Sequence, residues 1–503
     1  MKKMLSSLLV LTILSGCIGD EFDTDLLVDD VNVNAGVAIP LAKTSVTMED
    51  ILSDQTDMVK YDGENIILFQ ENDSLEYVGI NDFFRLSASS IDLLVPFEAF
   101  NTQPSYEATE ELTFSIPNAA VNEMELNYRL SASGSNLEEP LLLTVAIPVS
   151  NVPGAVREVV LEVYNGQTTV QSFTGDRISL LQNKVDLGLS VQPLYGGANY
   201  STSMGNVTLT IDELSLNYVK GTMDENQVTM DEGIYELDFD VLKDIPGDIE
   251  FADPQLSIIV DNATPFMGEI AAGLSGRLDD GSTMPLSSVP FTIDGADSGE
   301  EVKRSRHILT SENSNVSSFI AKTPEQLNYG GILTLNPGGV LGDEVELYDE
   351  DRIYIGYGFE VPLELRLNAA LDEEVVELGD IDMIDDLTKG NIVITSVNSL
   401  PIGASATIDF YEEQSSSIIE TMNIDMVKPA LVNAEGKVSE AVESIVEVTL
   451  TDKQIESLKA ASELRVRVQL NTSDYEKGQM VVFQRQNALE MQLGIRGKIE
   501  YNN

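Results

Sequence analysis

The stretch "LRVRVQLN" (464–471) decides the fold class, because apolar and polar side chains alternate in it without a break. Leu, Val, Val and Leu occupy the even positions 464–470, and Arg, Arg and Gln occupy 465, 467 and 469. Successive side chains of a β-strand point to opposite faces, so this stretch predicts a strand with one apolar and one polar face. Strands of this kind are typical of antiparallel sheets that pack on one side, as in sandwiches.

The same period of two recurs along the chain, in "EVPLELRLN" (360–368), in 404–413 and in 489–501. Helical periodicity is confined to short stretches, at 47–54, 323–328 and 451–464, the last with a capping-box pair at Thr451 and Gln454. The sequence therefore predicts an all-β protein of tandem antiparallel β-sandwich, immunoglobulin-like domains with a few short helices.

A weak internal repeat gives a first division into domains. The segments 149–164, 258–274 and 394–410 each contain a strand, an Asn, a short turn, a Pro and a second strand. Their asparagines are Asn151, Asn262 and Asn398, and the spacings of 111 and 136 residues match the size of a sandwich domain. The expected ranges are a signal peptide at 1–16, an acidic tether at 17–35, a β-rich domain at 36–148, and sandwiches at 149–250, 251–388 and 389–503.

The composition is strongly acidic and bounds the partners. Without Lys2 and Lys3, which lie in the N-terminal segment, 27 Lys and Arg remain against 84 Asp and Glu, a net charge of −57. Such a surface repels nucleic acid, so nucleic acid is not expected as a partner. A hydrophobic content of 43% is sufficient for packed cores.

The only cysteine, Cys17, follows an apolar run over residues 4–14. Eleven residues are too few for a membrane-spanning helix, which needs about 20, and fit the apolar part of a secretory signal. The tetrad Leu-Ser-Gly-Cys at 14–17 resembles the lipobox of bacterial lipoproteins. The resemblance implies removal of 1–16 and attachment of diacylglycerol and a palmitate-type acyl chain to Cys17. The alternative is a free, buried cysteine behind an ordinary cleaved signal.

The residues after the cysteine suggest a destination. "GDEFDTD" (19–25) is similar to the acidic export tag of surface lipoproteins of Bacteroidota. The resemblance implies an outer-membrane protein that faces the cell surface, with the periplasmic face as the alternative. The tag residues would be Asp20, Glu21, Asp23 and Asp25.

Few residues are available for catalysis or metal binding. One histidine and no cysteine beyond Cys17 exclude zinc sites of His and Cys ligands, and haem and iron–sulfur sites with their usual ligands. The sequence contains no nucleophile elbow, P-loop or dinucleotide fingerprint, so no enzyme activity and no cofactor are expected. Calcium is the one plausible metal, because the chain is rich in carboxylate oxygens. The candidate segment is 379–386, and the alternative interpretation is that this segment is a solvated acidic loop without a metal. The calcium candidates are Asp380, Asp382, Asp385 and Asp386.

Lys303, Arg304, Arg306 and His307 form the densest positive cluster of the chain. They could dock an acidic partner surface or a lipid phosphate. Alternatively, they protect a strand edge or balance neighbouring carboxylates.

Together these features predict a non-enzymatic, lipid-anchored cell-envelope protein. It would bind the membrane through its N-terminal lipid and serve as a surface adhesin, a scaffold or an accessory subunit beside a protein partner in the outer membrane. The alternative is a lipoprotein that binds a glycan or lipid for an outer-membrane transporter, which a deep apolar or Tyr-lined cavity would favour. A glycosidase would instead need two carboxylates facing each other across a cleft.

Overall fold

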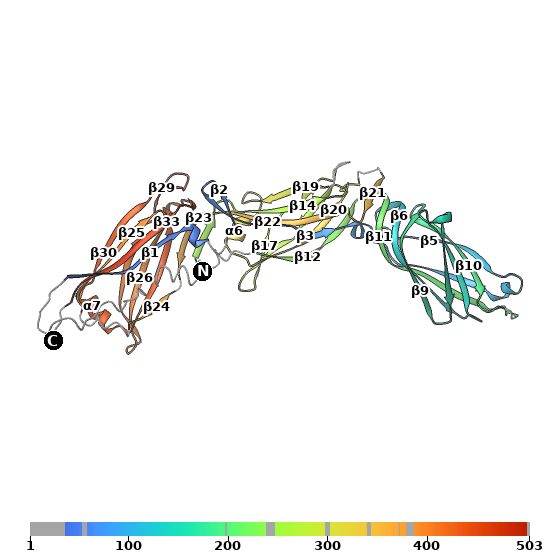
Figure 1. Cartoon of the computed structure of the whole chain (residues 1–503), viewed down its shortest axis with the longest axis horizontal. Coiled ribbons are helices and arrows are strands. Elements are labelled where there is room, and N and C mark those ends of the chain that lie inside the picture. Colours follow the sequence, from blue (N-terminus) through green and yellow to red (C-terminus); the bar gives the residue numbers. More distant parts are fainter. Residues whose placement is uncertain are drawn as a thin grey trace.

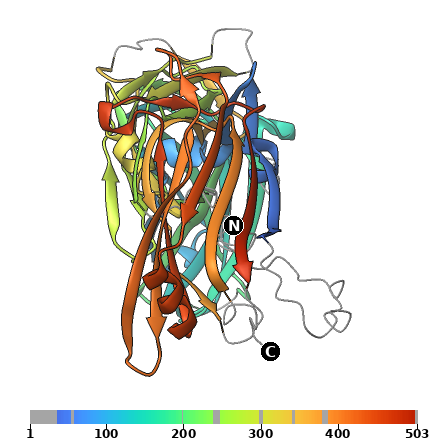
Figure 2. The same ribbon diagram turned by 90° about the vertical axis from the view of Figure 1, so that its left-hand side faces the viewer.

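A computed structural model describes residues 36–52, 58–196, 199–237, 247–296, 302–339, 344–371, 373–378 and 387–499. Most of these residues lie in strands, the helices are short, and every ladder between two of the strands named below is antiparallel. The prediction of an all-β fold of antiparallel sandwiches with a few short helices is therefore confirmed. Figure 1 shows three sandwiches in a row, which we name the base, middle and tip sandwiches. Figure 2 looks along this row from the base sandwich.

The base sandwich contains the first and the last strand of the described chain. Its first sheet is β1 (Gly36–Thr47), β33 (Ala488–Ile499), β25 (Leu387–Asn398) and β30 (Val442–Thr449). Its second sheet is β13 (Gly247–Phe251), β23 (Glu364–Ala370), β31 (Glu463–Thr472), β26 (Ile402–Glu412) and β27 (Ser417–Val427), with β24 (Glu374–Glu377) on β31 and β32 (Val481–Val482) on β23. The smaller elements are α3 (Met48–Ile51), α7 (Asp452–Ala460), η7 (Tyr475–Lys477) and the hairpin of β28 (Leu431–Val432) with β29 (Val438–Glu440).

The middle sandwich repeats this plan. Its first sheet is β19 (Lys303–Leu309), β14 (Gln255–Asn262), β22 (Ile353–Pro362), β3 (Asn65–Val78) and β2 (Val59–Asp62). Its second sheet is β17 (Thr283–Leu286), β16 (Leu274–Arg277), β20 (Gln326–Leu335), β15 (Gly268–Ala272) and β18 (Phe291–Ile293), with β12 (Asn226–Glu236) on β20. Two short helices complete it, α4 (Ile80–Phe83) and α6 (Val316–Ile320).

The tip sandwich is built from one nearly continuous part of the chain. Its first sheet is β21 (Val345–Tyr348), β11 (Met204–Met223), β6 (Ala119–Ser135) and β9 (Thr168–Ser179), with β4 (Ser89–Pro96) also on β11. Its second sheet is β5 (Tyr106–Thr113), β10 (Lys184–Pro193), β7 (Leu141–Pro148) and β8 (Val156–Val163). Two 3-10 turns, η4 (Phe97–Asn101) and η5 (Pro153–Ala155), join its strands.

All three sandwiches have the same strand order. When the eight principal strands of each are numbered along the chain, one sheet has the order 1-8-3-6 and the other 2-7-4-5. In the tip sandwich these sheets are β4-β11-β6-β9 and β5-β10-β7-β8. This is the order of an eight-stranded jelly roll, whereas an immunoglobulin domain has seven strands in the sheets ABED and CFG. The sandwich class is as predicted, and the topology is the jelly roll.

The three jelly rolls are nested in the chain. In the base sandwich the first strand is β1 and the second is β23. The chain between them builds the other two sandwiches, apart from α3 and the edge strand β13, which belong to the base. In the middle sandwich the first strand is β3 and the second is β12, and the chain between them builds the tip sandwich. Each sandwich is thus inserted between strands 1 and 2 of the preceding one.

The sheets therefore group the chain differently from the contiguous ranges 36–148, 149–250, 251–388 and 389–503. Residues of the first range alone contribute β1 to the base, β3 to the middle and β4 to the tip sandwich. The stretch 360–368 shows the reason, because its alternation continues across the boundary from β22 of the middle into β23 of the base. Alternation reports which face of a strand is buried and carries no information about which strand lies beside it.

Local predictions mostly hold. The capping box of α7 forms, with the Thr451 hydroxyl accepting from the Gln454 N–H and the Gln454 side chain accepting from the Thr451 N–H at 2.9 Å. The helical stretch at 47–54 becomes α3. The expected helix at 323–328 is wrong, because Thr323 has a left-handed φ of 44° and β20 begins at Gln326. The helix of that connection lies earlier, as α6.

Candidate functional site

Four connections meet at the outer end of the tip sandwich. Register brings them together, since Pro96 at the end of β4 pairs with Met204 at the start of β11, and Leu141 at the start of β7 pairs with Pro193 at the end of β10. These connections, named the tip loops, are 97–105, 136–140, 164–167 and the described residues of 194–203. Figure 1 places them at the opposite end of the molecule from the start of β1.

An aromatic cluster closes the centre of the tip. Phe97, Phe100 and Tyr200 stand with ring centroids 5.7 to 5.9 Å apart. The Asn101 side chain donates to the Tyr200 carbonyl at 3.0 Å and accepts from the Tyr200 N–H at 2.9 Å. Two loops far apart in the sequence are thereby fixed to each other.

Two carboxylates attach a third loop to this cluster. Glu138 accepts hydrogen bonds from the hydroxyls of Ser201 and Ser203. Both bonds lower the pKa of the Glu138 carboxyl, and the bond from Ser201 has the larger effect. The Tyr200 hydroxyl donates to Glu139. Burial is the main reason, and this hydrogen bond the second, that the pKa of Tyr200 is raised to about 12. The tip is consequently a preformed surface, which reduces the ordering cost of binding.

The tip loops largely expose one tyrosine ring and carry no positive charge. Tyr195 is 73% exposed, and the hydroxyl of the nearby Tyr164 donates to Glu162. The tip loops contain no Lys and no Arg. This surface offers tyrosine rings, carboxylates, hydroxyls and amides, which suit binding.

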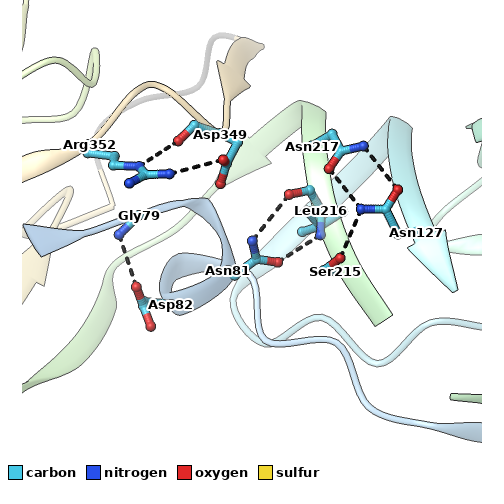
Figure 3. Close-up of polar contacts among 9 residues, drawn as sticks. All are labelled: Gly79, Asn81, Asp82, Asn127, Ser215, Leu216, Asn217, Asp349 and Arg352. Atoms are coloured by element: carbon cyan, nitrogen blue, oxygen red, sulfur yellow. Dashed lines mark hydrogen bonds and ion pairs between the residues drawn. The ribbon is translucent and has the colours of Figure 1, made fainter. Parts of the chain in front are cut away.

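The junction between the middle and tip sandwiches is held by side chains (Figure 3). The ladder of β11 with β6 is irregular between Asp212 and Ser215 and between Leu216 and Tyr218. Asn81 of α4 supplies partners there, accepting from the Leu216 N–H at 2.7 Å and donating to the Leu216 carbonyl at 3.2 Å. Asp82 holds the start of the same helix by accepting from the Gly79 N–H at 3.0 Å.

Strand β21 forms a second link across this junction. It leaves the middle sandwich after β20 and pairs with β11 of the tip sandwich before the chain returns as β22. Lys220 binds Glu346 at 2.7 Å, and Tyr218 lies against Tyr348 with centroids 4.9 Å apart. Next to the strand, Asn122 donates to Glu344 at 2.8 Å, and this bond, helped by Lys220, lowers the pKa of Glu344.

The junction between the base and middle sandwiches has similar links. The Leu363 N–H donates to the Ile66 carbonyl at 2.9 Å, and the Phe483 N–H donates to the Leu363 carbonyl at 2.9 Å. Arg485 forms an ion pair with Glu49 at 2.8 Å, and its backbone N–H donates to the Glu64 carbonyl at 2.9 Å. Segments from both ends of the chain meet here.

The predicted basic cluster lies on β19, at the edge of the first sheet of the middle sandwich. Arg304 binds Asp261 through two bonds of 2.6 and 2.7 Å, and Arg306 reaches Ser257 at 2.9 Å and Glu71 at 2.8 Å. Both arginines therefore balance carboxylates of their own sheet.

His307 of the same strand stacks on Phe291 with centroids 4.2 Å apart, and burial lowers the pKa of its imidazole. Lys303 is half-buried. The cluster is thus built into the sheet, and docking of an acidic partner stays a prediction.

The other predicted residues lie outside the described residues. They are the lipidation site Cys17, the tag residues Asp20, Glu21, Asp23 and Asp25, and the calcium candidates Asp380, Asp382, Asp385 and Asp386. Within the described ranges, no group of three or more His, Cys, Asp or Glu is arranged to hold a metal ion. Among the same residues, no helix is both long and apolar enough to cross a membrane.

The interior of the tip sandwich contains one hollow of interest for the ligand-binding alternative. It lies between the two sheets, and apolar side chains and Tyr128 surround it. The hollow has no room for a water molecule. This hollow is therefore a packing feature of the core and not a ligand cavity. Its lining residues are Leu112, Phe114, Leu126, Tyr128, Ile147, Ile178, Val185, Leu187 and Ile211.

Comparison with known proteins gives no family. No family model matches the chain, and no curated protein matches it. Among solved structures, a protein of Parabacteroides distasonis described as secreted is 10% identical, with a TM-score of 0.29, over 93% of this chain and all of that one. A tandem CBM22 domain of Paenibacillus barcinonensis Xyn10C is 11% identical, with a TM-score of 0.14, over 66% of this chain and all of that one. The infectious bursal disease virus Gx strain structure is 8% identical, with a TM-score of 0.15, over 88% and 82% of the two chains. TM-scores this low carry no argument about fold or function.

The tip loops were missed at the sequence level. Their residues are spread over about a hundred positions, from Phe97 to Ser203, and only strand pairing brings them together. One signal was present for the first of these loops, 97–105, because no Lys or Arg occurs between Arg85 and Arg129.

Proposed function

We propose that the protein is a non-enzymatic, lipid-anchored protein of the cell surface that acts as a stiff spacer and presents the tip loops to a partner. The observation that carries this proposal is the nesting of the three jelly rolls. The first described residue, Gly36, lies 19 positions after Cys17 and starts β1 at the end opposite the tip loops (Figure 1). An anchor at Cys17 would therefore attach the base and leave the tip farthest away.

Nesting supports stiffness because it multiplies the connections. The chain passes four times between the base and middle sandwiches and four times between the middle and tip sandwiches. Nesting accounts for two crossings at each junction, and the excursions of the chain to β13 and β21 account for the other two. Sandwiches strung on single linkers move relative to each other by default. Four crossings, together with the hydrogen bonds of Asn81 and Arg485, oppose such motion.

The test labels the tip on intact cells. Tyr195→Cys places a thiol on the tip, and the lipid on Cys17 would leave this thiol as the only reactive one. A membrane-impermeant maleimide should label this variant on intact cells, and a second chain with Cys17→Ser should leave the membrane fraction. Labelling only after permeabilisation would place the protein on the periplasmic face, and membrane retention of the Cys17→Ser chain would contradict the anchor.

The acidic tag has its own test in the same assay. Replacing Asp20, Glu21, Asp23 and Asp25 by Ala in the Tyr195→Cys chain should abolish labelling of intact cells while membrane attachment persists. Undiminished labelling would remove these residues from the export signal.

A further inference from the structure

The sixth strands of the base and middle sandwiches, β30 and β19, are both sheet edges. In the part of the chain that the structure describes, no strand pairs with the outer side of either one. Both ladders to their inner neighbours are regular, and neither strand contains a Pro or a bulge. Proteins prevent pairing at such edges by Pro, by bulges or by charged side chains, and of these devices the two strands have only the charges.

The exposed faces of the two edges are complementary. On β30, Glu443, Ile445 and Glu447 point outward, and Ile445 is 74% exposed. On β19, Arg306 and Ile308 point outward, with Ile308 39% exposed and the Arg306 side chain 42% exposed. One edge presents carboxylates, and the other presents arginines that are about half exposed although each is ion-paired with a carboxylate of its own sheet. Each edge also has an isoleucine.

We propose that β19 of one copy of the protein pairs antiparallel with β30 of a second copy, with Ile308 opposite Ile445 and Arg306 opposite Glu447. In this register Arg304 lies opposite Thr449 and His307 opposite Val446. The register joins an opposite-charge pair and a β-branched pair, both of which stabilise neighbouring strands.

Pairing of each edge with itself is opposed by charge. An antiparallel β30 pair centred on Ile445 places Glu443 opposite Glu447, and like charges directly opposite destabilise a ladder. An antiparallel β19 pair centred on Ser305 places Arg304 opposite Arg306. The two edges consequently select each other.

The geometry fixes the relative direction of the two copies. The antiparallel ladders give β19 and β30 the same direction, since each strand starts at the tip-facing end of its sandwich and runs toward the base end. Antiparallel pairing then sets the two molecules antiparallel, with the base of one beside the middle of the other. This arrangement suits molecules from two facing surfaces, but the pairing does not depend on the proposed anchor and can be measured in solution.

Cross-linking tests the register. In the Cys17→Ser background the chain has no cysteine, so Ile308→Cys in one full-length chain and Ile445→Cys in another give single thiols. Mixed at 0.15 M NaCl and mildly oxidised, these chains should form disulfide-linked dimers at least ten times faster than Ile445→Cys mixed with Val170→Cys. Val170 is a matched control, because it is 57% exposed on β9, the sixth strand of the tip sandwich. Equal rates with both partners would overturn the proposal.

Charge exchange gives an independent test by sedimentation velocity. Glu447→Arg should raise the dissociation constant at least tenfold, and adding Arg306→Glu to the same chain should restore it to within threefold of the original. A monomer at all concentrations, or a double variant no tighter than Glu447→Arg alone, contradicts the pairing. Because cross-linking leaves Arg306 intact, a folding defect from Arg306→Glu would not obscure the result.

Discussion

At the residue scale, two of the three asparagines of the predicted repeat share one role. Asn262 accepts from the Thr264 N–H at 2.9 Å and donates to the Phe266 and Asp294 carbonyls at 2.8 and 2.9 Å. Asn398 accepts from the Leu400 N–H at 2.9 Å and donates to the Ile402 and Lys428 carbonyls, both at 2.8 Å. Each fixes the corner where strand 3 crosses to strand 4 in the other sheet. Asn151 instead lies in the hairpin of β7 and β8, so the repeat predicted from the sequence is equivalent at two positions only.

We expect Asn398→Ala to cost about 3 kcal/mol of unfolding free energy, because it leaves a buried N–H and two carbonyls without partners. Asn262→Ala should cost a similar amount. Asn151→Ala is the matched control and should cost about 1 kcal/mol or less, since its carbonyl and N–H partners are exposed to water. Urea unfolding of each variant measures the difference, and equal losses at all three positions would contradict the corner role.

The single histidine allows a pH prediction at one site. His307 stacks on Phe291, and its Nε2 is buried without a hydrogen-bond partner among the described residues. Burial lowers the pKa of folded His307, so the unfolded chain takes up a proton more readily as the pH falls through its ordinary value of about 6.5. The melting temperature of the protein should therefore fall between pH 7 and 5 relative to that of His307→Gln. Parallel curves for both chains would show that this imidazole titrates normally.

At the element scale, sequence reasoning reached the strands and missed their partners. The alternation at 464–471 correctly placed Leu464, Val466 and Val468 in the core, and the capping pair correctly began α7. The pairing of β1 with β33 joins Gly36 to Lys498, and no local pattern encodes a contact across so much chain. For the same reason the tip loops, which lie in four separate connections, could not be assembled from the sequence.

Asn81 makes the middle-to-tip junction testable. Asn81→Ala removes the side-chain hydrogen bonds to the N–H and the carbonyl of Leu216, at the irregular part of β11. Leaving a buried backbone group without its partner costs about 1–3 kcal/mol. Hydrogen exchange of peptides over 212–221 should become about tenfold faster or more, while peptides over 464–471 in the base sandwich stay unchanged. Unchanged exchange at 212–221 would mean that the Asn81 hydrogen bonds do not hold this junction.

At the scale of the whole molecule, nesting predicts which part can fold alone. The tip sandwich takes its eight principal strands from residues 89–223, whereas the middle and base sandwiches need strands from both sides of an insertion. A fragment of residues 86–223 should therefore unfold cooperatively as a β protein, judged by circular dichroism. A fragment of residues 36–223 should add no second transition, because β1 lacks β33 and β3 lacks β22 and keeps only the short β2. An unfolded 86–223 fragment would contradict the independence of the tip.

The net charge of the chain should make its stability depend on salt. The −57 of the chain without its N-terminal segment crowds carboxylates on sheet faces, and their repulsion destabilises the compact state. The Debye length shortens from about 30 Å at 0.01 M salt to about 8 Å at 0.15 M, while hydrophobic burial hardly changes over this range. The melting temperature of a fragment of residues 18–503 should therefore rise by a few degrees from low salt to 0.15 M NaCl. A flat or falling curve would mean that ion pairs such as Arg129 with Asp212, at 2.7 Å, outweigh the repulsion.

Millimolar calcium should add a further rise in melting temperature, beyond that of NaCl at equal ionic strength, only if the loop with Asp380, Asp382, Asp385 and Asp386 binds the ion. Replacing these four by Asn would then abolish the excess, and no excess in the original chain would remove calcium as a ligand.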